Sequence, residues 1–223
     1  MGAGIIIMSP EGRAQNTSET RIEVIRLPQP RHDSHTSVER TLLERRSVRD
    51  FKKDDLLTLE EVSQLLWAAQ GVTSAESFRT APSAGATYPL EVFIAVGNVR
   101  NLPAGIYHYH PNGHHLTNVE KGDRRKDLSV AALEQQFIRD AAAVIVFSAV
   151  YDRTTLKYGE RGKRYVHIEV GHAAQNVCLQ AVALNIGTVT VGALRDDEVK
   201  KILKLTDGQE PLYIMPVGRK LGG

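Results

Sequence analysis

Four residues near the start of the chain carry side chains that bind phosphate: Arg45, Arg46, Ser47 and Arg49. A guanidinium group keeps its charge and can bind two phosphate oxygens at once, and a serine hydroxyl adds a further donor. Arginines that follow a helix can also complement the negative end of the helix dipole and point into water. Taken alone, the segment fits an anion site and a helix end equally well.

A second segment, Pro82-Ser83-Ala84-Gly85, is a bend of small residues. Small side chains let the backbone approach a flat ligand closely. A serine nucleophile at a Gly-x-Ser-x-Gly elbow needs glycine on both sides of the serine, which this segment lacks, so an esterase is poorly supported. Ser83 is better interpreted as a hydrogen-bonding residue. The alternative is an ordinary turn that leads into a strand at Leu90.

The composition is that of one ordinary globular domain, with 223 residues, 42% hydrophobic and 24% charged. We expect a flexible leader at residues 1–21 and a folded domain at residues 22–223. A formal net charge of +2 and an apolar run of only five residues at 4–8 give no indication of nucleic acid or a membrane as a partner. The single cysteine, Cys178, excludes an internal disulfide and fits a reducing compartment, so we expect a cytoplasmic protein.

Two helices are expected close to the first motif. One should begin at Ser37, with Val38, Leu42 and Leu43 as its apolar face. It should end at residues 45–49, which we call the arginine segment. The next should cover residues 58–70, with a capping box formed by its first residue and Glu61 and with a glycine directly after it.

The other expected elements alternate irregularly. They are an extended arm at 22–27, a hairpin at 105–116, strands at 90–96, 141–150, 187–192 and 212–218, and helices at 164–185 and 196–203. Because strands and helices do not follow a regular βαβ order, an α+β fold is favoured.

Two groups of polar residues have more than one interpretation. Glu169, His172, Asn176 and Gln180 form one stripe on the long helix, which could face a ligand, although pairing with structural partners is favoured. A hairpin carries His108 and His110 on one face, with His114 able to return opposite them. Without a carboxylate or cysteine nearby in the sequence, we expect a solvated hairpin and no metal site.

Several motifs, taken in order, resemble FMN-dependent nitroreductases, and most closely the SagB-type dehydrogenase branch. They are Arg45-Arg46-Ser47-x-Arg49-x-Phe51, Pro82-Ser83-Ala84-Gly85-x-x-x-Pro89, Gly171-His172-x-x-Gln175-Asn176 and Gly187-Thr188-Val189-Thr190-Val191-Gly192. The resemblance extends from about residue 22 to the C-terminus. It implies an α+β nitroreductase-like fold with a central mixed, mainly antiparallel sheet flanked by helices. It also implies an intertwined homodimer that holds two FMN molecules at the subunit interface.

The resemblance assigns roles to single residues. The FMN phosphate and ribitol would be held by Arg45, Arg46, Ser47 and Arg49, and the flavin would be reached from the partner subunit by Pro82, Ser83 and Ala84. The remaining cofactor-binding residues would be Gln175, Val191, Gly192 and Arg219, of which Val191 and Gly192 would present backbone to the ring and Arg219, with Lys220 as a neighbour, would complete the phosphate site.

The implied activity is the transfer of two electrons from NAD(P)H through FMN to a small planar acceptor such as a nitroaromatic, a quinone or a free flavin. One alternative is a SagB-type azoline dehydrogenase that acts on a modified peptide, in which a Lys-Tyr pair is linked to catalysis. Lys157 and Tyr158 match that pair, and a surface or dimer-contact role fits them at least as well. The compact chain favours the first activity. A non-catalytic FMN-binding protein is a further alternative.

Overall fold

The computed structural model describes residues 23–222, and the expected leader at 1–21 lies outside them. Seven strands form one sheet in the order β1-β4-β3-β2-β5-β7-β6. The strands are β1 (Val24–Arg26), β2 (Leu90–Val96), β3 (Gly105–His110), β4 (His115–Lys121), β5 (Ala143–Val150), β6 (Ile186–Thr188) and β7 (Gln209–Arg219). All neighbouring strands are antiparallel, and the parallel component is an isolated bridge between Leu57 and Val99. The expected α+β fold is confirmed.

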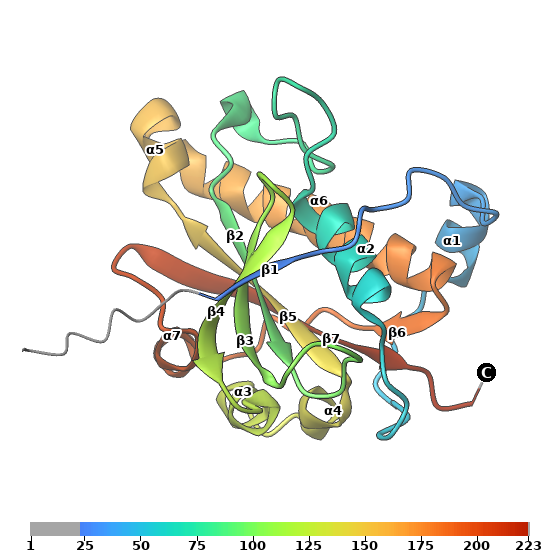
Figure 1. Ribbon diagram of the computed structural model, residues 1–223. Helices are drawn as coiled ribbons and strands as arrows, with labels where there is room; N and C mark the ends of the chain where they lie inside the picture. The colour runs from blue at the N-terminus through green and yellow to red at the C-terminus, as the bar shows by residue number, and fades with distance from the viewer. Residues whose placement is uncertain (1–22, 223) are drawn as a thin grey trace, which may run out of the picture.

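Helices cover both faces of this sheet (Figure 1). They are α1 (Val38–Glu44), α2 (Leu59–Gln70), α3 (Arg125–Ala131), α4 (Gln136–Asp140), α5 (Asp152–Tyr158), α6 (Arg161–Ala183) and α7 (Asp196–Leu203), with a 3-10 turn, η1, at Ala84–Ala86. Side chains alternate across each strand, so Val92 and Ile94 of β2 pack with α2 and α6, whereas Phe93 and Ala95 pack with α3, α4 and α7. The sheet therefore separates two hydrophobic cores.

The helix α2 forms as its sequence predicts. Thr58 Oγ1 accepts a hydrogen bond from the Glu61 N–H at 3.3 Å, and Glu61 Oε2 accepts one from the Thr58 N–H at 2.8 Å. This reciprocal pair is the expected capping box, and Gly71 follows the last helical residue. The helix is thereby fixed at both ends, with its apolar stripe against the sheet.

The helix α1 also begins as expected, because the Ser37 side chain accepts a hydrogen bond from the Arg40 N–H. Its expected apolar face, however, is uncovered in the single chain: Val38, Leu42 and Leu43 are 64%, 56% and 66% exposed. The face is amphipathic in sequence but has no partner within the described chain.

Several expected elements differ in extent: β7 begins at Gln209, three residues before its predicted start, and β4 continues to Lys121, beyond the predicted end of the hairpin at 116. The long helix α6 begins at Arg161, three residues before its predicted start, and the predicted strand 187–192 is reduced to Ile186–Thr188. The register of β6 with β7 would place Val189 opposite Pro216, which has no N–H to donate. Pairing resumes only at Val191 and Ile214, which exchange both backbone hydrogen bonds. The proline shortens the ladder.

Within residues 23–222, none of the helices is long and apolar enough to cross a lipid bilayer.

Candidate active site

The arginine segment lies beside the ends of β6 and β7, although more than 130 residues separate it from them in the chain. The Val48 N–H donates to the Thr188 carbonyl and the Lys52 N–H to the Arg219 carbonyl, both at 3.0 Å. A Cβ atom at Gly187 would lie 2.6 Å from Val48 Cγ1, so glycine permits this close approach. The first and last motifs of the sequence are thus neighbours.

The three arginines of this segment have different surroundings. Arg46 Nη1 donates to the carbonyls of Leu43 and Arg45 at 2.9 and 2.8 Å, so this side chain satisfies the carbonyl end of α1. The Arg49 guanidinium carbon lies 5.8 Å from the centroid of the Phe137 ring. None of the three has an acidic partner within 4.0 Å in the described chain. Arg46 is the helix-end arginine that the sequence allowed, and Arg45 and Arg49 keep their charge available.

Arg219 is placed near this segment by its backbone, but its side chain points elsewhere. Its Nη1 lies 2.7 Å from Glu61 Oε1, and its Nη2 lies 2.9 Å from Glu61 Oε2. Arg219 also lines a hollow of about 250 Å³ together with Lys52, Asp55, Asn185 and Lys220. In the described chain the guanidinium fork of Arg219 is therefore engaged by the carboxylate that also caps α2.

A cavity of about 280 Å³ lies between the small-residue bend and α6. It is lined by Pro82, Ser83 and Ala84 from the bend and by Tyr165, Ile168, Glu169 and His172 from the helix. Ser83 Oγ accepts a hydrogen bond from the Tyr88 N–H at 2.9 Å, so the serine shapes the bend as a hydrogen-bonding residue. The Asn176 side chain donates to the Thr80 carbonyl at 3.1 Å and ties α6 to the same segment.

The side chains of Lys157 and Tyr158 both reach the bend, despite being adjacent on α5. Lys157 Nζ donates to the Gly85 carbonyl at 3.3 Å. A Cβ atom at Gly85 would lie 2.5 Å from Tyr158 Oη and 2.6 Å from Lys157 Nζ, and the φ angle of 60° at Gly85 also favours glycine. The Tyr158 ring meets the Tyr165 ring edge to face at 5.2 Å. The pair therefore stands at the edge of the cavity.

The polar stripe of α6 divides into two parts. Gln180 Oε1 accepts a hydrogen bond from Gln64 Nε2 at 3.1 Å. Gln180 and Asn176 therefore both pair with structural partners, as favoured for this stripe. Glu169 and His172 line the cavity instead. Tyr165 and Ile168 were missed by the sequence analysis, although residues 165, 168, 169 and 172 have the spacing of one helical face. Extending the stripe by one turn toward the N-terminus would have found them.

Glu169 has an unusual environment for a carboxyl group. The residue is 3% exposed, and its Oε1 has no hydrogen-bond partner in the described chain. Burial raises the pKa of Glu169 to about 7, although the nearby Ser83 hydroxyl and the Arg79 charge favour the carboxylate. Glu169 is therefore an acid that lines the cavity and has a pKa near neutral pH.

The other expected cofactor-binding residues lie apart from this cavity. Val191 is buried and pairs with Ile214, whereas Gly192 and Gln175 are exposed. A Cβ atom at Gly192 would lie 3.4 Å from the Tyr213 ring. Within the described chain, no hydrogen bond or ion pair joins these three residues to the arginine segment or to the bend, so their roles stay predictions.

The histidine hairpin differs in detail from its prediction. The structure brings in a carboxylate that the sequence had not placed nearby: Glu91 Oε2 lies 2.6 Å from His108 Nε2. His115, and not His114, joins the row, because its ring stacks on His110 at 4.6 Å while His114 Nε2 contacts Ser63 Oγ at 2.7 Å. Among residues 23–222 there is no group of three or more His, Cys, Asp or Glu side chains that could hold a metal ion.

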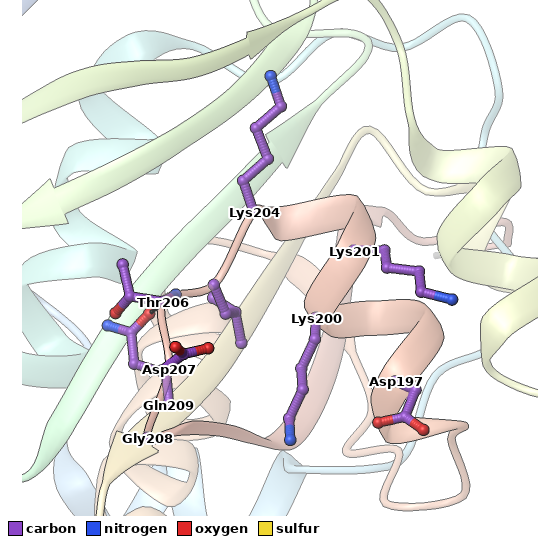
Figure 2. Close-up of a pocket in the computed structure, with 9 residues that line it drawn as sticks. Asp197, Lys200, Lys201, Lys204, Thr206, Asp207, Gly208 and Gln209 are labelled. Atoms are coloured by element: carbon purple, nitrogen blue, oxygen red, sulfur yellow. Dashed lines mark hydrogen bonds between the residues drawn. The ribbon is translucent and has the colours of Figure 1, made fainter.

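A larger hollow of about 440 Å³ lies at the end of α7, away from these residues (Figure 2). Lys200, Lys201 and Lys204 line it, but Figure 2 shows their side chains pointing in different directions. Lys200 Nζ lies 2.7 Å from Glu210 Oε2, and Lys204 pairs with Glu120. The lysines do not converge on one point, so this hollow is not the candidate site.

Comparison with known proteins finds relatives in sequence and solved structures of the same fold. A Methanocaldococcus jannaschii protein named as a nitroreductase is 48% identical over 184 residues, which cover 82% of this chain and 91% of that protein. A crystal structure described as that of a nitroreductase from Ralstonia eutropha has a TM-score of 0.78 and 29% identity, with 90% of each chain covered.

Two more distant relatives are named for different activities. The FMN reductase (NADPH) of Bacillus subtilis is 23% identical over 192 residues, which cover 80% of this chain and 64% of that protein. The microcin B17-processing protein of Escherichia coli is 26% identical over 162 residues, which cover 70% of this chain and 60% of that protein. The sequence profile of the Nitroreductase family matches residues 42–219. The protein therefore belongs to the nitroreductase family.

Proposed function

We propose that this protein is an FMN-dependent oxidoreductase that transfers two electrons from NAD(P)H to a small planar acceptor such as a quinone, a nitroaromatic or a free flavin. The observation that carries the proposal is a pair of arginines, Arg45 and Arg49, that have no acidic partner in the described chain. Half of the other arginines of that part have an acidic partner, as Arg40 has in Glu44 and Arg153 in Glu91. Cations kept without a counterion suit an anionic ligand, and a flavin phosphate is the one that the family provides.

The residues fit FMN in their chemistry. Arg45, Arg49 and the exposed Ser47 hydroxyl would bind the phosphate, and Arg46 would hold the end of α1 in place beside them. When bound, FMN accepts a hydride from one substrate and passes two electrons to the next. The bend at Pro82 would limit access of water to the reacting edge, and the small residues there leave room for a flat ring.

A homodimer is part of the proposal, because each half of the site is incomplete alone. The exposed apolar face of α1 needs a covering surface, and a second copy of the chain would supply it. The arginine segment of one subunit and the bend of its partner would then enclose the cofactor. The lone cysteine, Cys178, is buried and suits a reducing compartment, so we place the enzyme in the cytoplasm.

A second candidate is a dehydrogenase that oxidises azoline rings in a modified peptide. Lys157 and Tyr158 favour it, because both reach Gly85 at the edge of the cavity and could remove a proton from a bound ring. The likeness to the microcin B17-processing protein also supports it.

Reduction of the bound flavin separates these candidates. The FMN-loaded protein is mixed anaerobically with NADH, NADPH or an azoline peptide while the visible flavin absorption is followed. The proposal expects a nicotinamide nucleotide to bleach the flavin. Bleaching by the peptide alone would favour the second candidate. A bound flavin that none of the three donors reduces would indicate a non-catalytic FMN-binding protein.

A further inference from the structure

Glu169 is an acid that the fold holds in an unusual position. Its carboxyl lines the cavity between α6 and the bend, the residue is 3% exposed, and Oε1 has no hydrogen-bond partner among residues 23–222. A buried polar atom without a partner costs free energy unless a ligand or a proton satisfies it. A proton on the carboxyl relieves this cost, and Glu169 still lines the cavity into which a ligand would bind.

Burial holds this carboxyl in its protonated form, while two nearby groups keep it able to ionise. Arg79, from the segment after α2, contributes a positive charge, and Ser83 of the bend contributes a hydroxyl. Tyr165 and His172, one turn to either side on α6, line the same cavity. Burial outweighs Arg79 and Ser83, so the acid holds its proton into the neutral range, where a proton donor is most useful.

We propose that Glu169 is the general acid that protonates an oxygen-bearing acceptor, such as a quinone, bound in this cavity. The inference rests on the proposed function, which supplies reduced flavin as the hydride donor. A quinone that takes up a hydride carries two additional electrons and one negative charge on oxygen. The proton from Glu169 neutralises that oxygen and yields the hydroquinone, and the carboxylate left behind recovers its proton from solvent.

The test compares Glu169→Gln with Glu160→Gln in the FMN-loaded protein. Glutamine keeps the size and polarity of the side chain but cannot give up a proton, and Glu160 is an exposed residue at the start of α6. The bound flavin is photoreduced, so no nicotinamide nucleotide is needed, and it is then mixed anaerobically with benzoquinone or with ferricyanide. Ferricyanide accepts electrons without a proton, so its reaction reports on the flavin alone.

We expect benzoquinone to reoxidise the Glu169→Gln flavin about a hundredfold more slowly than the wild-type flavin, with the ferricyanide rate unchanged. The wild-type benzoquinone rate should fall as the pH rises above about 7, where the acid ionises, and the slow rate of the variant should not vary with pH. Glu160→Gln should behave as the wild type. Equal benzoquinone rates in Glu169→Gln and wild type would overturn the inference. A parallel loss with ferricyanide would also overturn it, because Glu169 would then act on the flavin site as a whole.

Infrared spectroscopy gives a readout that is independent of turnover. The wild-type protein should show the C=O band of a protonated carboxyl at slightly acidic pH, and this band should disappear as the pH rises through about 7 and be absent from Glu169→Gln. Absence of the band from the wild type would contradict the inference and leave the proposed function standing. A protein that retains no FMN would contradict both.

Discussion

In the arginine segment, one residue holds the backbone, and two others are those that we propose bind the phosphate. Arg46 donates to two carbonyls at the end of α1, which fixes the turn from which Arg45 and Arg49 project. Neither of those two has an acidic partner in the described part of the chain. A charge-assisted hydrogen bond to phosphate is worth roughly 1.5 to 3 kcal/mol, so each arginine should be measurable by itself.

Replacing Arg45 by alanine should lower the affinity for FMN by about 1 to 3 kcal/mol, because a charge-assisted contact to the phosphate is lost. Quenching of flavin fluorescence in a binding titration measures this affinity. Arg40→Ala is the matched control, since Arg40 lies in α1, just before the arginine segment, but is paired with Glu44. An unchanged FMN affinity in Arg45→Ala would remove the phosphate assignment.

The pKa of Glu169 also predicts how stability depends on pH. The folded protein binds a proton up to about pH 7, whereas the unfolded chain releases it near 4.5, so between these values the folded state holds more protons. The free energy of unfolding should therefore fall as the pH rises through this range, and this contribution is fully present only below about 4.5.

The variant Glu169→Gln lacks this proton and should be less sensitive to pH. Relative to wild type, its free energy of unfolding should increase by about 1 to 3 kcal/mol between about pH 4.5 and pH 7.5. Urea unfolding at a series of pH values measures the difference. A constant difference across the series would mean that the pKa of Glu169 is not raised in the folded protein.

At the scale of elements, one carboxylate connects the start of α2 with the end of β7. Glu61 accepts the Thr58 N–H in the capping box and also pairs with both terminal nitrogens of Arg219. The end of β7 is thereby connected to the start of α2, although the two are far apart in the sequence. The guanidinium of Arg219 is oriented by this contact.

Thr58→Ala should cost about 1 kcal/mol of stability, because α2 loses the hydroxyl half of its capping box. Glu61→Ala should cost more, since it removes the other half and also leaves the mostly buried Arg219 with only the more distant Asp55, 3.8 Å away, as an acidic partner. Urea unfolding measures both variants. A larger loss in Thr58→Ala than in Glu61→Ala would contradict the double role of Glu61.

Local signals explain which elements the sequence predicted. The capping box of α2, the N-cap at Ser37 and the turn between β3 and β4 are each encoded within a few residues, and all were found. The helices α3, α4 and α5 span five to seven residues, too short to show a helical period, and were missed. Pro216 lies in β7 and shortens β6, the strand that pairs with it. The sequence of β6 itself gives no sign of this early end.

Contacts within the site depend on the fold and were only partly predictable. The sequence named Lys157 and Tyr158, but their approach to Gly85 crosses 72 residues of chain. Helical periodicity placed Glu169 on a polar stripe and could not say that Asn176 would be paired while Glu169 Oε1 stayed without a partner. Burial, which raises the pKa of Glu169, is a property of the packed molecule.

At the scale of the whole molecule, one apolar surface is left uncovered in the described chain. The face of α1 formed by Val38, Leu42 and Leu43 stands at one end of the molecule beside the last turns of α6 (Figure 1). Exposed leucines and valines grouped on one helix are typical of protein interfaces. A homodimer joined through this face would place the arginine segment, which follows α1 directly, at the subunit boundary.

Leu42→Asp should weaken the dimer, because a charge would be buried in an apolar contact. Sedimentation velocity measures the oligomeric state, and flavin absorption in the same run reports whether FMN is lost with dissociation. Leu133→Asp is the control, as Leu133 is exposed at the end of α3 on the other face of the sheet. A dimer that is equally stable in Leu42→Asp would place the interface elsewhere.

The central claim is that the chain holds FMN and passes electrons from a nicotinamide nucleotide through it. The most direct measurement is an anaerobic titration of the FMN-loaded protein with NADH and with NADPH, followed by the visible flavin absorption. We predict about one FMN per chain and full bleaching by about one equivalent of one of the two nucleotides, because each transfers one hydride. A protein that retains no FMN, or a bound flavin that remains oxidised with both nucleotides in excess, would contradict the claim.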